Sequence, residues 1–183
     1  MHFPALAVIQ FSMCPPESNA WISVVGVVAG ALVGATAVFI PNMLIERYRF
    51  RRESLSVKAA LIAEIDALVE IADERKYLES IAEAVAYLET QPEGATCAFE
   101  AIVPAHYSRI YQANAHRVGL LASSIAVEIV KFHQLLDAAA QDVSAGGVIA
   151  DGGSLAAFRQ NHQILSRALS IGRKLARDSG GVG

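Results

Sequence analysis

Charge is what this sequence has least of, and its absence is concentrated in one stretch. Only 18% of the 183 residues are charged, whereas 54% are hydrophobic. No Asp, Glu, Lys or Arg occurs between residues 18 and 45. A composition this apolar is unusual for a soluble domain and indicates a membrane protein. The net charge of −3 gives no broad basic field, so we expect no nucleic-acid partner.

Cysteine and histidine are sparse and form no recognised motif. Cys14 and Cys97 match no metal-binding or redox spacing. None of the four histidines after residue 100 lies three or four residues from another in a ligand-like pattern. Zinc-protease, P-loop and nucleophile-elbow motifs are also missing from the sequence. We therefore predict that the protein is not an enzyme and has no catalytic residue, metal site or cofactor site.

The uncharged stretch has the length of a membrane span. Residues 20–40 form an apolar run of about twenty residues, which as a helix crosses the roughly 30 Å hydrocarbon core of a bilayer. Trp21 lies at one end, where an amphipathic ring prefers the interface. We therefore predict a transmembrane helix over residues 20–41, ending at Pro41, after a short extracytoplasmic segment over residues 1–19.

Basic residues give this span an orientation. The first twenty residues contain no Lys or Arg, whereas Arg47, Arg49, Arg51 and Arg52 follow the span in the juxtamembrane segment 42–53. The positive-inside rule places the N-terminus outside and the C-terminal part in the cytoplasm. The four arginines would also attract anionic lipid headgroups, at about 1 kcal/mol each.

Three glycines within the span are spaced four residues apart. Gly26, Gly30 and Gly34 share one helix face and repeat the G-x-x-x-G pattern twice. In lipid no hydrophobic force draws helices together, so small residues that permit close backbone approach favour association. The pattern predicts a contact with a second copy of the chain or with another membrane protein.

The remaining chain has helical periodicity and no strand-type alternation. Apolar residues recur at three- and four-residue steps over 55–88, which predicts one long helix that ends at residues 91–94. A short helix is expected over about 104–115, followed by a turn over 116–121. The next helix is expected to begin at an N-cap on Ser123 or Ser124, and the last helix to run from an N-cap at Ser154 to Arg177. Residues 146–153 are expected to form a loop and 178–183 a disordered tail.

These patterns predict an all-α protein. One N-terminal transmembrane helix is followed by a small cytoplasmic antiparallel helical bundle over residues 54–177, which contains one long helix. Segment 61–91 carries eight acidic residues and segment 154–177 five basic ones, so the two are natural neighbours in this bundle. The alternative is that the basic helix lies on anionic lipid.

Residues 110–136 carry a more specific signal. Their sequence contains the pattern Y-x-A-N-x-x-x-x-G-x-L followed by I-V-x-F, formed by Tyr111, Ala113, Asn114, Gly119, Leu121, Ile129, Val130 and Phe132. This tract resembles uncharacterised bacterial inner-membrane proteins with a single N-terminal span and a cytoplasmic helical domain. His133 stands where those proteins usually have tyrosine. The resemblance implies a bacterial inner-membrane location and no assigned activity.

Three functional hypotheses are compatible with these observations. The first is a membrane-anchored interaction or scaffold protein that associates through its glycine-lined face and its bundle. The second is a homo-oligomeric pore or membrane-disrupting effector, although Thr36 is the one polar residue suited to line a channel. The third is a membrane-anchored enzyme with a site formed by His106, His116 and Tyr111. The lack of a catalytic motif favours the first.

Overall fold

The computed structural model describes residues 20–180, except for the side chains at positions 20, 22, 23, 36–38, 41, 179 and 180. The predicted extracytoplasmic segment 1–19, with Cys14, and residues 181–183 lie outside this range. The chain divides into two units, Met1–Tyr48 and Arg49–Gly183. Nearly all regular structure in the described range is helical, which confirms the all-α prediction.

The described part of the N-terminal unit is a single stretch of helix. It is the first part of α1, whose bounds are Ala20–Glu74, and it contains all of the predicted span 20–41. Every described side chain in this part is exposed.

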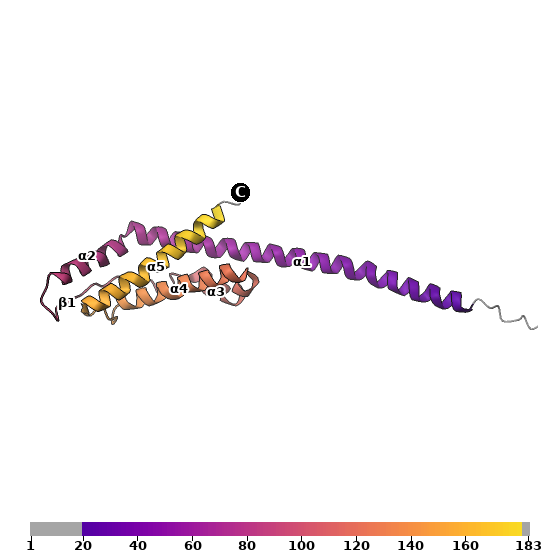
Figure 1. Ribbon diagram of the computed structural model, residues 1–183. Coiled ribbons are helices and arrows are strands. Elements are labelled where there is room, and N and C mark those ends of the chain that lie inside the picture. Colours follow the sequence, from indigo (N-terminus) through magenta and orange to yellow (C-terminus); the bar gives the residue numbers. More distant parts are fainter. Residues whose placement is uncertain (1–19, 181–183) are drawn as a thin grey trace, which may run out of the picture. The chain divides into compact units, whose positions relative to one another are not determined.

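The C-terminal unit contains the end of α1 from Arg49 and all the other elements. These are α2 (Tyr77–Glu89), β1 (Thr96–Cys97), α3 (Arg109–Asn114), the 3-10 helix η1 (Ala115–Leu120), α4 (Ser123–Val143), β2 (Gly153–Ser154) and α5 (Leu155–Gly180). Within this unit α1, α2 and α4 run in one direction and α5 in the opposite one (Figure 1). The chain returns between α2 and α3 as an irregular crossover, which explains why α4 has the direction of α1.

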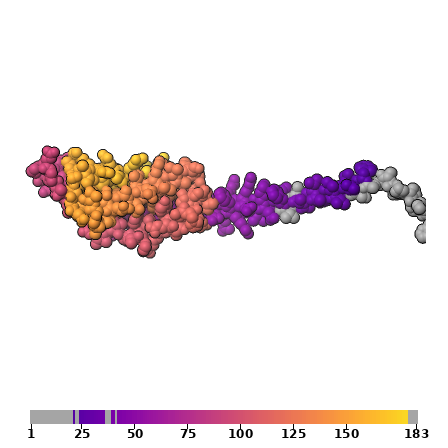
Figure 2. Space-filling view, turned by 90° about the horizontal axis from the view of Figure 1, so that it is seen from below, coloured from indigo at the N-terminus to yellow at the C-terminus, as the bar shows by residue number. Residues whose placement is uncertain are grey.

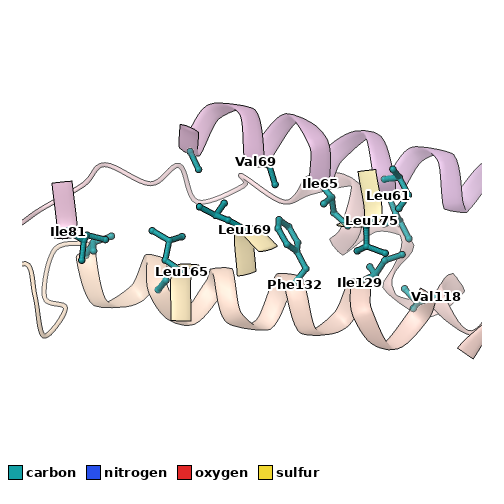
Figure 3. Packing of buried hydrophobic residues seen from close by; sticks show 14 of the residues in the cluster. Leu61, Ile65, Val69, Ile81, Val118, Ile129, Phe132, Leu165, Leu169 and Leu175 are labelled. Carbon is teal, nitrogen blue, oxygen red and sulfur yellow. The ribbon is translucent and has the colours of Figure 1, made fainter. Parts of the chain in front are cut away.

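A helical bundle with one hydrophobic core results. Leu61, Ile65 and Val69 of α1 face Phe132 of α4 and Leu169 of α5 (Figure 3). Phe132, Ile65 and Leu61 are fully buried, and such side chains each stabilise the fold by about 1.5–3 kcal/mol. α4 and α5 each turn one apolar side to this core, since Ile129, Phe132, Phe158, Leu165 and Leu169 are all buried.

Gly172 lets α5 approach its neighbours closely. A Cβ atom at this position would lie 2.6 Å from Val69 Cγ2 and 2.7 Å from Phe132 Cε2. Only a residue without a side chain fits this approach without displacing both neighbours. Figure 2 shows one face of the unit, on which the side chains of α4 (orange) and α5 (yellow) lie next to each other.

The prediction of one long helix over 55–88 is wrong. α1 ends at Glu74, and α2 begins at Tyr77 after Lys76 adopts the left-handed conformation with φ of 53°. Such a conformation costs a non-glycine residue about 1–2 kcal/mol. The change of direction lets Ile81 and Leu88 of α2 reach the core, where both are buried.

Several boundaries also differ from the sequence-based predictions. The helix expected over 104–115 is shorter, and residues 115–120 form a 3-10 helix where a turn was expected. The N-cap residue of α4 is Ala122, without a side-chain bond, so the predicted cap at Ser123 or Ser124 is wrong. The Ser154 hydroxyl does accept a hydrogen bond from the Ala157 amide at 3.4 Å, as an N-cap residue does. α5 continues to Gly180, into the predicted tail.

A short strand pair was not predicted. β1 and β2 pair antiparallel, with Thr96 opposite Ser154 and Cys97 opposite Gly153. Two-residue strands are too short to show alternation in the sequence. Further along, the Phe99 amide donates to the Ile149 carbonyl at 3.1 Å and the Ala101 amide to the Val143 carbonyl at 2.9 Å. We call residues 96–107 the strap, because these bonds fasten its first half to the α4–α5 connection.

Candidate functional site

The glycine face of the N-terminal unit is open. Apart from the neighbouring residues and the backbone of the helix itself, no described atom lies within 4 Å of a Cβ atom built on Gly26, Gly30 or Gly34. A second helix therefore has room to approach this face closely.

Large apolar side chains surround the same helix. Val24, Val25, Val27 and Val28 are all more than half exposed, and helical geometry directs them to different sides. Farther along, Leu32, Val33, Phe39 and Ile40 are equally exposed. Among the residues with described side chains, no helix reaches the combination of length and apolarity that crossing a membrane requires. Seven positions of the predicted span, among them Thr36 of the pore hypothesis, lie outside the described side chains.

The basic segment that follows is available for contacts. Arg47, Arg49, Arg51 and Arg52 are exposed, and none of them forms an ion pair with a described residue. Just beyond them, Glu53 pairs with Arg117 and the Ser54 hydroxyl donates to the Leu120 carbonyl at 2.9 Å.

A buried carboxylate occupies the middle of the C-terminal unit. Glu64 of α1 is only 8% exposed, and its two oxygens accept hydrogen bonds from the Ile110 amide at 2.6 Å and the Tyr111 amide at 2.8 Å. These amides belong to the first turn of α3, where no intrahelical acceptor exists. Glu64 thus caps α3 from a distant helix, and the negative charge suits the positive end of the helix dipole.

His133 lies beside this carboxylate. Its side chain is 3% exposed, stacks on the Tyr111 ring with centroids 3.9 Å apart, and meets the edge of Phe132. Nε2 lies 3.9 Å from a Glu64 oxygen, beyond hydrogen-bond distance, and neither ring nitrogen has a described partner. Burial lowers the pKa of His133 to about 4, although Asp137 opposes the shift. The imidazole is therefore neutral at pH 7 and acts as an aromatic core residue.

The histidine site of the enzyme hypothesis is not assembled. His106 and His116 are exposed, whereas Tyr111 is occupied by its stacking on a different histidine, His133. His162 of α5 is half-buried. No group of three or more potential metal ligands occurs among the described residues.

The second feature of the C-terminal unit is an apolar cavity of about 510 Å³. Its wall is built by the end of α1, the start of α2, the strap, α4 and α5. Polar groups come from four side chains in the wall: Arg75, Tyr77, Tyr107 and Asn161. The Tyr107 hydroxyl donates to Asp137 at 2.6 Å, and its burial and this bond raise the pKa of Tyr107.

Asn161 is the most constrained of these groups. It is fully buried, and its Nδ2 donates to the Ala139 carbonyl at 3.0 Å and to Asp142 Oδ2 at 3.1 Å. Both partners are acceptors, so the orientation of the amide is determined. Its Oδ1 is a buried acceptor without a described partner.

Sequence reasoning did not identify Glu64, Asn161 or the cavity. Glu64 looks like one more acid on a solvated helix face, because its partners are 46 and 47 residues away. Asn161 lies between Phe158 and Leu165 on the buried apolar side of α5, and a polar residue at helical spacing between apolar ones is the one signal that the sequence offers.

Comparisons with protein-family models, with curated proteins and with solved structures found no match to this chain. The resemblance of residues 110–136 to bacterial inner-membrane proteins therefore stays a prediction.

Proposed function

We propose that this protein is a membrane-anchored interaction protein. Residues 20–41 lie in a bilayer as a single span, and the face formed by Gly26, Gly30 and Gly34 packs against a second copy of the chain or another membrane protein. The helical C-terminal unit is cytoplasmic, the N-terminus is outside, and the membrane is the bacterial inner membrane. The four juxtamembrane arginines contact anionic headgroups.

One observation carries this proposal. Apolar side chains are exposed on every side of α1 between residues 24 and 45, and a helix with no polar face requires an apolar solvent. The sequence supports the same conclusion, because residues 20–41 are uncharged and long enough to cross a bilayer as a helix. The open glycine face supports close helix–helix contact as the mode of association. The orientation rests on the arginines alone.

The anchoring is tested by extracting bacterial membranes with alkaline carbonate. The full chain should stay in the membrane fraction. The orientation is tested by substituting Gln for Arg47, Arg49, Arg51 and Arg52, which should change the protease accessibility of a C-terminal tag. Complete extraction by carbonate would overturn the proposed span.

Association is tested separately through the glycine face. The intact complex is isolated with mild detergent by a C-terminal tag, and its mass is measured. Gly30→Leu should reduce the assembled fraction at least about fivefold, since close packing is lost. Ala31→Leu, about 100° away on the helix, is the matched control and should change it little. The mass distinguishes a self-assembly from a complex with a second polypeptide. Equal assembly of both variants would exclude the glycine face.

A further inference from the structure

We propose that the cavity in the C-terminal unit binds one anionic single-chain amphiphile that carries an amide N–H near its head, as an N-acyl amino acid does. The cavity volume of about 510 Å³ falls within the 300–1,000 Å³ of typical small-molecule sites. The cavity belongs wholly to one unit, so this proposal is independent of the membrane span.

The wall suits an alkyl chain. Leu68, Ile81, Val143 and Leu165 line it from four different helices, and the strap adds further apolar residues. At the strap, Ile102 is 85% exposed although it is a large aliphatic residue in the cavity wall. An alkyl chain that lies against Ile102 would remove apolar surface from water, which favours binding.

A positive charge is available for the head. Arg75 is exposed, and its described hydrogen bond goes from Nη1 to the Tyr77 hydroxyl at 3.1 Å. No described carboxylate lies within ion-pair distance of its guanidinium. The neighbouring acid Asp73 pairs with Arg173 instead. The remaining N–H groups of Arg75 can bind a carboxylate in the fork geometry that arginine favours.

An unused acceptor determines the third part of the ligand. Asn161 Oδ1 is buried in the wall without a described partner, and its amide cannot be flipped because Nδ2 already serves two acceptors. An unpaired buried acceptor is energetically costly, and a donor on the ligand would remove that cost. Tyr107 offers no such donor, since its hydroxyl donates to Asp137. The ligand therefore carries a hydrogen-bond donor, a role that we assign to the amide N–H of an N-acyl amino acid.

The experiment is photo-crosslinking of the full chain, reconstituted in phospholipid nanodiscs, with N-dodecanoylglycine that bears a diazirine on its chain. Labelled peptides are mapped by mass spectrometry. Label is expected in the peptides that contain residues 68–81 and 99–107. Label confined to residues 20–45 would mean simple partition into the bilayer and would overturn the proposal.

Three unlabelled competitors test the ligand class. N-dodecanoylglycine should displace the cavity label about tenfold better than N-dodecanoylsarcosine, in which a methyl group replaces the amide hydrogen. It should also displace it about tenfold better than the uncharged N-dodecanoylglycinamide. Equal displacement by all three would overturn the assigned roles of Asn161 and Arg75.

Matched variants locate the site. Ala140→Phe places a large side chain in the wall and should abolish cavity labelling, whereas Ala138→Phe, at an exposed position of the same helix, should retain it. Arg75→Gln should remove the preference for the charged competitor, and Arg167→Gln, an exposed arginine outside the wall, should keep it. Circular dichroism confirms that each variant is folded. Undiminished cavity labelling of folded Ala140→Phe would overturn the proposal.

Discussion

At the scale of single residues, burial determines how His133 behaves. The ring lies between Tyr111 and Phe132, and no described group offers either nitrogen a hydrogen bond. A neutral imidazole tolerates these surroundings better than an imidazolium, because a charge in an apolar site loses its hydration.

The low pKa of His133 predicts a pH-dependent stability. The folded state holds this proton only below about pH 4, whereas the unfolded chain binds it below about 6.5. Stability from this group is thus complete above pH 6.5 and is lost as the pH falls toward 4, by roughly 3 kcal/mol. His133→Phe should remove that part of the slope, measured by urea unfolding at pH 7.5 and 4.5. His106→Phe, at an exposed position, should keep the slope, and an unchanged slope in both variants would contradict the prediction.

A second residue-scale prediction concerns Gly172. An alanine there brings Cβ within 2.7 Å of Phe132 and closer still to Val69, so α5 must shift. We expect Gly172→Ala to destabilise the protein by about 1–3 kcal/mol despite the better helix propensity of alanine. Gly119→Ala is the control, because nothing lies within 4 Å of the added Cβ. The melting temperatures of both variants are measured by thermal unfolding. Equal melting temperatures would show that α5 can shift to make room for the added methyl group without loss of stability.

At the scale of secondary-structure elements, α3 depends on a distant side chain. The helix has six residues, too few to be stable alone, and its N-cap residue Ser108 makes no side-chain cap bond. The two amides of its first turn are instead bonded to Glu64. The start of α3 is therefore held against the middle of α1.

Loss of this distant cap should have a measurable cost. Glu64→Ala leaves two part-buried amides without their acceptor, and we expect a loss of about 2–4 kcal/mol in the free energy of unfolding. Amide hydrogen exchange at Ile110 and Tyr111 should accelerate more than exchange in α5. Glu70→Ala, at an exposed position of the same helix, is the control. Unchanged protection of both amides would rule out the capping role.

The helices could be predicted from the sequence more readily than the turns between them. Apolar stripes such as Ile129, Phe132 and Leu136 repeat regularly, so periodicity located α4 and α5 well. The break at Lys76 has no glycine or proline to indicate it, and its cause is tertiary, since α2 bends to bury Ile81. Glu64 and Asn161 were missed for the same reason, because their partners are far away in the sequence.

At the scale of the whole molecule, ion pairs link the acidic and basic helices of the C-terminal unit as predicted. Arg173 of α5 pairs with Asp73 of α1 at 2.5 Å, and Arg159 of α5 with Glu89 of α2 at 2.7 Å. All four side chains are 44–54% exposed, so solvent screens them. These pairs help to select one arrangement of the helices, but each adds little to the free energy of unfolding.

A double-mutant cycle on Asp73→Asn and Arg173→Gln tests this interpretation. We expect a coupling energy below about 1 kcal/mol, which decreases further at 1 M NaCl. A parallel cycle on Glu89 and Arg159 should give a similar value. A coupling above about 2 kcal/mol in either cycle would mean that the exposed pairs are a main source of stability.

The packing of Gly172 against Val69 has a consequence for synthesis on the ribosome. These partners are 103 residues apart, and the chain is made at roughly 5–20 residues per second. The apolar side of α1 around Val69 thus emerges roughly 5–20 seconds before the helix that covers it. During that interval the nascent chain exposes a hydrophobic surface, which makes it a natural client for a chaperone or an insertion factor waiting at the exit tunnel.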